Sequence, residues 1–349
     1  MKLPFVFLTV LCAIVLPREA DAAETAVHAP KTAKDQMLHT LVETAIAPGY
    51  AKLAEACGLL EKETRRFEEQ PDLPGLERAR DCWRKAAEAA QEIDCCRVGP
   101  ILEGDLAATF FFLPTRPGSV EKAILAMKQD DVDLSSFGAA AKGLYAIEYL
   151  LFPKDVDAAA TLALFEESKR RHYLHAIAAE AAERSGRLAR SWQESYSPAA
   201  TAFLNGGQDS LNALVNRMVM TAEAASVTRL STMLNPPERA TRDKVPGAAS
   251  GHSHVLLQAV VRGLRRVHEA GMGAHVKKFN PELAARLDQR FQETIAALSK
   301  LEKPLESQGP DTSALMESTR QCNQLAVLLK VDLASSLGVT LTFISTDGD

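Results

Sequence analysis

The residues with the clearest chemical potential lie in one apolar stretch, 143–152. It reads Gly-Leu-Tyr-Ala-Ile-Glu-Tyr-Leu-Leu-Phe, and Glu148 is its only charged residue. At 3.6 residues per turn, Tyr145 and Glu148 share one arc of a helix whose other faces are also apolar. Because a helix that is apolar all round is buried, we expect Glu148 in the interior, where an ionised carboxylate is costly unless it is paired.

Glu148 can be interpreted in two ways. As a structural group it would pair with a cation such as Arg97, or with hydroxyl groups, because buried charges are normally compensated. As a functional group it would bind a metal ion or anchor a ligand, because buried carboxyls are also frequent at sites. Burial would raise the pKa of Glu148 and a neighbouring cation would lower it. The residues alone leave both interpretations open.

Two pairs of histidines are further candidates for metal ligands. His172 and His175 are three residues apart on a predicted helix and could face one ion, although the basic run 169–171 beside them favours a surface position. His252 and His254 lie in a loop before another predicted helix, and we expect Ser250 or Ser253 to cap that helix. His172 therefore joins Glu148 as a candidate metal ligand.

Composition and motifs exclude several classes of function. The 349 residues are 46% hydrophobic and 24% charged, which is a globular balance, and the formal net charge is −5. With no dense basic patch, this charge gives no support to a nucleic-acid partner. The catalytic patterns G-x-S-x-G and H-E-x-x-H and a glycine-rich phosphate loop are missing from the sequence.

Residues 1–22 have the form of an export signal. Lys2 precedes an apolar run from Leu3 to Leu16, and Ala20-Asp21-Ala22 forms an A-x-A cleavage site. We expect a protein exported to a periplasm and cleaved after Ala22. Beyond the signal no uninterrupted apolar run approaches about 18 residues, so no membrane-spanning helix is predicted.

Five cysteines remain after this signal, an odd number for an oxidising compartment: Cys57, Cys82, Cys95, Cys96 and Cys322. We expect most of them to be core thiols, and a disulfide such as Cys57–Cys82 is left open.

Helical spacing of apolar residues extends over nearly the whole mature chain, which predicts an all-α protein of long antiparallel helices in two packed bundles. A stretch with Pro and Gly near 195–207 separates two predicted bundles, 33–197 and 208–345. Phe110-Phe111-Phe112 is expected to form a buried loop that fills the core. The predicted helices are 36–69 with a bend or break at Pro48, 76–96, 119–128 capped by Ser119, 143–152, one long helix after Pro153 that ends near 196, 209–234, 254–269, 281–303 and 312–337.

Four stretches in this order resemble the imelysin-like family, also called peptidase family M75. They are Cys82-Trp83 through Arg97-Val98-Gly99-Pro100, Phe111 to Pro114 with Pro117-Gly118, Gly143 to Phe152, and Asp332 to Asp349. The resemblance implies an exported two-bundle protein with a site between helices, built around a G-x-H-x-x-E segment. Family members are associated with iron uptake or iron-regulated expression, and the family name comes from an insulin-cleaving activity.

Here Gly143 and Glu148 match the motif, but Tyr145 stands in place of its histidine. A histidine and a glutamate three residues apart could hold zinc or iron, whereas a neutral phenol is a poorer ligand. We therefore place Arg97, Gly143, Tyr145 and Glu148 at a ligand site.

The leading hypothesis is a non-enzymatic exported binding protein that acquires iron, another divalent or trivalent metal ion, or a small ligand, together with an uptake system of the inner or outer membrane. A metallopeptidase with Glu148 as metal ligand or general base is the first alternative. A helical protein-interaction module without a ligand site is the second.

Overall fold

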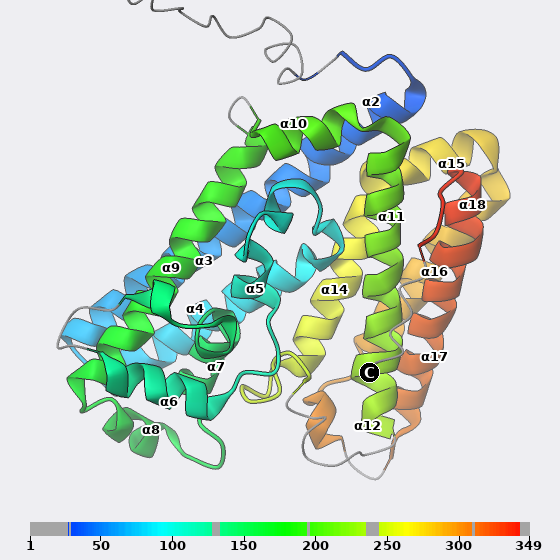
Figure 1. The fold of residues 1–349 in the computed structure, drawn as a ribbon. Coiled ribbons are helices and arrows are strands. Elements are labelled where there is room, and N and C mark those ends of the chain that lie inside the picture. Colours follow the sequence, from blue (N-terminus) through cyan, green and yellow to red (C-terminus); the bar gives the residue numbers. More distant parts are fainter. Residues whose placement is uncertain are drawn as a thin grey trace, which may run out of the picture.

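The computed structural model describes residue 27 and residues 29–127, 133–193, 196–234, 244–308 and 311–342. Every regular element in these ranges is helical, which confirms the predicted all-α fold (Figure 1). The predicted export signal, 1–22, lies outside the described residues. No helix in the described ranges is both long and apolar enough to span a membrane.

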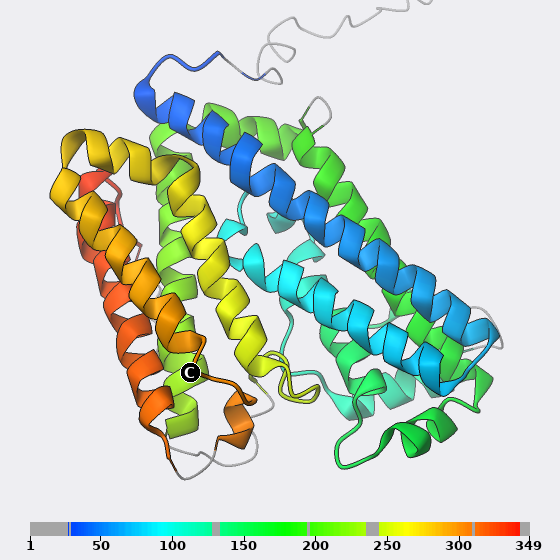
Figure 2. The same cartoon turned by 180° about the vertical axis from the view of Figure 1, so that it is seen from behind.

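The first half of the protein is built on three long helices, α3 (Ala47–Glu69), α4 (Leu73–Glu92) and α9 (Ser168–Gln193). Helix α3 lies along both α4 and α9 (Figure 2). Their apolar faces enclose Tyr50, Trp83 and Trp192, each at most 1% exposed. The shorter helices of this half are α5 (Leu106–Phe111), α6 (Pro117–Ala126), α7 (Leu144–Leu151) and α8 (Ala158–Leu164).

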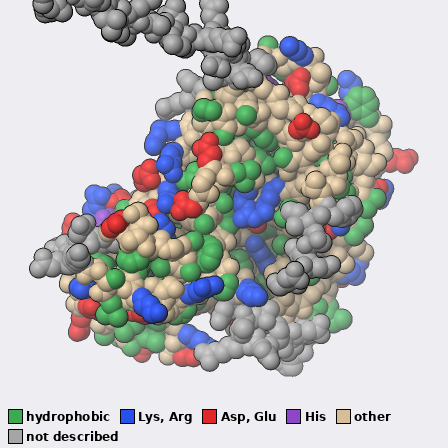
Figure 3. Space-filling model, viewed as in Figure 1, with side chains coloured by type: hydrophobic (Ala, Val, Ile, Leu, Met, Phe, Trp, Pro, Cys, Tyr) green, Lys and Arg blue, Asp and Glu red, His purple; other side chains and the backbone are tan. Residues whose placement is uncertain are grey.

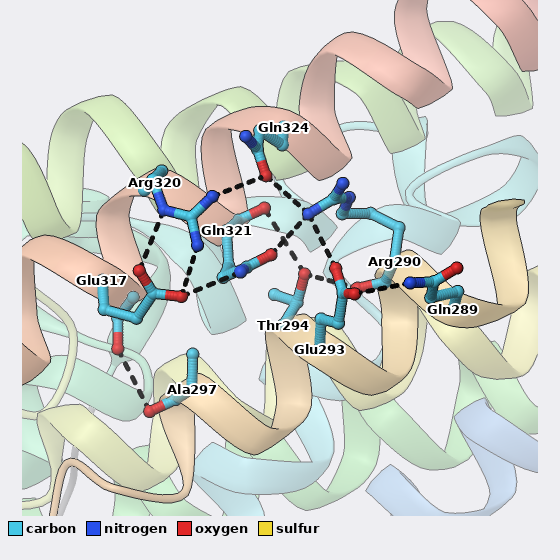
Figure 4. Close-up of polar contacts among 10 residues, drawn as sticks. Gln289, Arg290, Glu293, Thr294, Ala297, Glu317, Arg320, Gln321 and Gln324 are labelled. Atoms are coloured by element: carbon cyan, nitrogen blue, oxygen red, sulfur yellow. Dashed lines mark hydrogen bonds and ion pairs between the residues drawn. The ribbon is translucent and has the colours of Figure 1, made fainter.

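The second half follows the connecting helix α10 (Pro198–Asn205). Its long helices are α11 (Gly207–Ala224), α14 (Ser253–Val267), α16 (Pro281–Leu298) and α17 (Ser313–Leu328), and its short ones are α12 (Thr232–Leu234), α15 (Gly273–Phe279) and α18 (Ala334–Ser336). On the solvent side of α16 and α17, Arg290 donates to the side-chain oxygens of Gln321 (2.6 Å) and Gln324 (2.5 Å) (Figure 4). This polar network fixes the outer pair of helices.

The two halves meet where α14 crosses the end of α4. Gly263 of α14 lies against the backbone of Glu92, and a Cβ added at Gly263 would overlap the Glu92 carbonyl oxygen. The Glu92 carboxylate binds Arg262 (3.3 Å) and Arg266 (3.5 Å) of α14. Close backbone approach and ion pairs therefore hold the halves together at the same point.

Four predicted helices contain a π-helical segment. Residues 36–69 do not break at Pro48; instead α2 (Ala33–Leu41) continues through the π segment Val42–Ile46 into α3. Since Pro48 has no N–H to donate, a change of hydrogen-bond register just before it is tolerated. The other π segments are Ala225–Ser231, His268–Met272 and Leu329–Leu333. Short 3₁₀ helices occur at Asp94–Cys96, Gly99–Leu102, Leu134–Ser136, Ala139–Ala141 and Leu305–Ser307.

Three local predictions were wrong. Phe110 and Phe111 are the last two residues of helix α5 and are not part of a loop. Phe110 is buried in the core, and Phe111 is partly buried against it. The chain after Pro153 forms two helices, α8 and α9, and not one. Ser119 lies inside α6, which begins at Pro117, a residue whose fixed φ suits the first turn of a helix.

Every cysteine in the described residues is a free thiol, so the Cys57–Cys82 disulfide is not formed. The domain bounds 33–197 and 208–345 remain a prediction. The first of them places α2 with the first half, but α2 packs against the π segment His268–Met272 and against α11. Lys34 of α2 also donates to the carbonyl oxygen of Leu337 (2.9 Å).

We predict that Gly263→Ala destabilises the protein by about 2 kcal/mol or more, because the new methyl group must displace backbone atoms at the crossing. Urea unfolding would measure the loss. The matched control is Gly58→Ala on α3, where an added Cβ meets nothing within 4 Å, and where the substitution should stabilise by about 0.5–1 kcal/mol. Equal effects of the two substitutions would show that the crossing does not depend on glycine.

Candidate functional site

Helix α7 is fixed at its start by two contacts. Gly143 has φ +85°, and a Cβ at this position would lie 2.5 Å from the Thr109 carbonyl oxygen, so only glycine fits. The indole N–H of Trp83 donates to the carbonyl oxygen of Leu144 (2.7 Å). From this anchored start the helix carries Tyr145 and Glu148 into the interior, where they are 3% and 4% exposed. The predicted burial of Glu148 is thereby confirmed.

Glu148 contacts a loop of the second half. Its Oε1 accepts a hydrogen bond from the backbone N–H of Ser250 (2.9 Å). That loop bends at Gly247 (φ +80°) and Gly251 (φ +66°), where the left-handed backbone favours glycine. Burial raises the pKa of Glu148 to about 7, against the lowering effect of the Ser250 backbone and hydroxyl groups, and nearby Glu306 raises it further. Glu148 is therefore held by the Ser250 backbone, and its burial favours the protonated form.

Tyr145 begins a chain of polar side chains that crosses between the halves. Its hydroxyl accepts from the side-chain amide of Gln91 (2.8 Å), and the Gln91 oxygen accepts from Nη2 of Arg229 (2.7 Å). Arg229 lies on the π segment Ala225–Ser231 of the second half and is 8% exposed. Burial raises the pKa of Tyr145 well above its ordinary value, which Arg229 opposes, so the phenol is neutral.

Asp94 continues this chain and gathers three arginines. Its carboxylate contacts Nε of Arg97 (3.1 Å), Nη2 of Arg217 (2.5 Å) and Nη2 of Arg229 (3.8 Å). Arg97 also lies over the Phe111 ring, 4.6 Å from its centroid. We use the name seam for one set of polar residues: Gln91, Asp94, Arg97, Tyr145, Glu148, Arg217, Arg229 and Ser250.

The structure thus places Arg97, Gly143, Tyr145 and Glu148 close to the contact of the two halves, but it does not pair Arg97 with Glu148. Arg97 forms an ion pair with Asp94, and Glu148 accepts a hydrogen bond from Ser250. The structural interpretation allowed a cation or hydroxyl groups as the partner of Glu148, and the described residues show the backbone and hydroxyl of Ser250 there. The functional interpretation stays a hypothesis.

Comparison with known proteins identifies the family. A sequence model of imelysin, peptidase family M75, matches residues 46–331. The chain belongs to the imelysin family. It is 25% identical over 291 residues to iron-regulated protein A of Synechococcus elongatus, a match that covers 78% of this chain and 77% of that protein.

Two solved structures share the imelysin fold with this chain at a TM-score of 0.72. One is described as an iron-regulated protein A precursor from Parabacteroides distasonis, at 15% identity, covering 89% of this chain and 96% of that one. The other is an imelysin-like protein from Psychrobacter arcticum, at 18% identity, covering 91% and 99%. At these identities the likeness shows the fold alone.

In the described part of this imelysin-family chain, the candidate histidines do not form a metal-binding group with Glu148. His172 contacts Glu68 on α3, whereas His175, three residues further along α9, is half-buried. Nε2 of His252 is 2.9 Å from Glu88, and His252, not Ser250 or Ser253, is the residue before α14. Within the described ranges, no group of three or more His, Cys, Asp or Glu side chains is placed to hold a metal ion.

Sequence reasoning missed Gln91, Asp94, Arg217, Arg229 and Ser250. A signal for two of them was present, since Arg217 and Arg229 are the only basic residues in the stretch 209–234, where most other residues are apolar or uncharged. A charged residue on a largely buried helix is costly unless a polar or oppositely charged group contacts it, which is the argument that singled out Glu148. Their common partner, Asp94, lies more than a hundred residues earlier in the chain.

We predict that Glu148→Gln removes a pH dependence of stability. A carboxyl whose pKa is raised from 4.5 to about 7 favours the folded state when protonated, so the wild type should lose stability as pH rises through this window. The glutamine side chain can still accept from Ser250 but does not ionise. The variant should therefore equal the wild type near about pH 5 and exceed it near about pH 8, by at most about 3 kcal/mol.

Thermal unfolding at the two pH values would test this. The control is Glu55→Gln on the exposed side of α3, which should follow the wild type throughout. Parallel pH curves for Glu148→Gln and the wild type would show that Glu148 does not titrate in this range.

Proposed function

We propose that this protein is an exported, non-enzymatic binding protein that takes a small ligand at the seam and acts in the handling of iron. The observation that carries the proposal is the polar chain from Tyr145 through Gln91 and Arg229 to Asp94. It is buried, it spans both halves, and it leaves Nη1 of Arg229 without a hydrogen-bond partner in the described residues. Buried polar groups are normally satisfied, so an unsatisfied one at a junction favours a ligand.

The link to iron and to export comes from relatives. One relative is named for its regulation by iron, and a solved structure of the same fold is described as a precursor, which agrees with the export signal predicted at residues 1–22. On this proposal the protein releases its ligand to an uptake system of the inner or outer membrane.

The side chains at the seam also bear on the kind of ligand. A neutral phenol, an amide and guanidinium groups surround Arg229, and these groups donate hydrogen bonds but do not coordinate a bare cation well. The seam holds two carboxyl groups: Asp94 is already paired with arginines, and burial raises the pKa of Glu148 to about 7. A ligand that carries its own oxygen atoms fits this set better than a naked metal ion.

We expect the mature protein to retain iron after exposure to ferrous or ferric salts, and Glu148→Gln and Tyr145→Phe to retain less than about a tenth as much, because each loses a group that faces the ligand. Zinc and copper salts serve as comparisons. Elemental analysis after gel filtration gives the metal content, and Glu55→Gln is the control carboxylate. Equal iron content in all variants would remove Glu148 and Tyr145 from the site.

The metallopeptidase alternative keeps one supporting observation. A carboxyl with a pKa of about 7 is suited to general acid–base catalysis near neutral pH. If the protein cleaves an unstructured polypeptide, cleavage should stop on addition of a chelator and in Glu148→Gln. Cleavage that survives both treatments would come from a contaminant.

A further inference from the structure

The arginines at the seam outnumber the carboxylate that they contact. Arg97, Arg217 and Arg229 converge on Asp94, and the Asp94 side chain is only 9% exposed. The side chains of Arg217 and Arg229 are 16% and 10% exposed, so solvent screens these charges poorly. A buried charge is costly unless an opposite charge offsets it, and one carboxylate offsets only one of the three cations.

Arg229 is the group with free hydrogen-bonding capacity. Its Nη2 donates a hydrogen bond to Gln91 and lies 3.8 Å from the Asp94 carboxylate. Its Nη1 is buried and has no hydrogen-bond partner in the described residues. Burial lowers the pKa of Arg229, nearby Arg217 lowers it further, and Asp94 opposes both effects. A guanidinium in this state offers a pair of N–H groups to an acceptor that the protein does not supply.

Basic side chains also gather at the surface where the two halves meet. Figure 3 shows Lys and Arg side chains gathered in the hollow between the two halves on one face. Arg97 follows the end of α4, Arg217 lies on α11, and Arg229 lies on a π segment, a feature frequent at functional sites. An acceptor bound here would contact side chains from both halves at once.

We propose that the seam binds an oxyanion group, a carboxylate or a phosphate, of its ligand. This proposal rests on the proposed function and names the class of ligand. The free Nη1 of Arg229 can donate charge-assisted hydrogen bonds to an oxygen of such a group, in a fixed guanidinium geometry that a lysine reproduces only in part. The bound group supplies the negative charge that the cluster lacks, with Arg229 as its main contact and Arg97 and Arg217 beside it.

Calorimetric titration of the mature protein with citrate and with phosphate, at an ionic strength kept constant with sodium chloride, tests the proposal. We expect saturable binding of at least one of them. Arg229→Gln should weaken it by about tenfold or more, and Arg229→Lys should restore only part of it. Arg65→Gln, at a guanidinium that is 62% exposed on α3, is the control and should bind like the wild type. Binding of citrate alone would identify a carboxylate ligand, and binding of phosphate alone a phosphate.

Circular dichroism establishes that each variant is folded, and Arg217→Gln replaces Arg229→Gln if the latter does not fold. No saturable binding of either anion, or equal binding by wild type and Arg229→Gln, would overturn the proposal. Iron retained equally with and without citrate or phosphate would also overturn it, while leaving the iron-binding function in place. Anion binding that is unchanged in Glu148→Gln would support the oxyanion site and remove only Glu148 from the ligand.

Discussion

The crossing of α14 over the end of α4 is the constraint on which the rest of the structure depends. Because Gly263 has no side chain, the backbone of α14 can rest directly on the carbonyl group of Glu92. Gln91, Glu92 and Asp94 are thereby brought against the second half, and each has a polar partner there. Gln91 meets Arg229, Glu92 meets Arg262 and Arg266, and Asp94 meets Arg217. One close backbone contact thus determines a whole row of long-range polar pairs.

These pairs make the junction different from an ordinary helix interface. Most helices in the protein bury apolar faces, and such packing is tolerant of small changes in angle. Polar pairs need particular distances and orientations, so they specify one arrangement of the two halves more narrowly than apolar packing does. They also carry a desolvation cost, which is greatest where a charged group has no oppositely charged neighbour. Among the described residues, Glu148 has a backbone donor and no ion pair with a cation, whereas Arg229 shares its carboxylate neighbour, Asp94, with two other arginines.

The sequence predicted the parts of this arrangement that depend on local patterns. Helical periodicity predicted the all-α fold, and the apolar surroundings of Glu148 predicted its burial, because both follow from residues a few positions apart. The partners could not be predicted in this way. Ser250 is 102 positions from Glu148, and Arg229 is 138 positions from Gln91, so only the packing of the two halves brings them together. The π segments were also missed, since a wider turn inside a continuous helix is marked by no particular residue type.

The π segment that carries Arg229 has a consequence for how such chains can be compared. A π turn holds one residue more than the α-helix on either side of it, so the face presented by every later residue depends on that insertion. Loss of a single residue between Ala225 and Ser231 would restore a regular helix and rotate the positions after it by about 100°. In a sequence alignment with a relative that is about 25% identical, a one-residue gap inside this helix changes which residue of the relative is aligned with Arg229. Counting along the sequence would not find it, whereas superposition of the structures would.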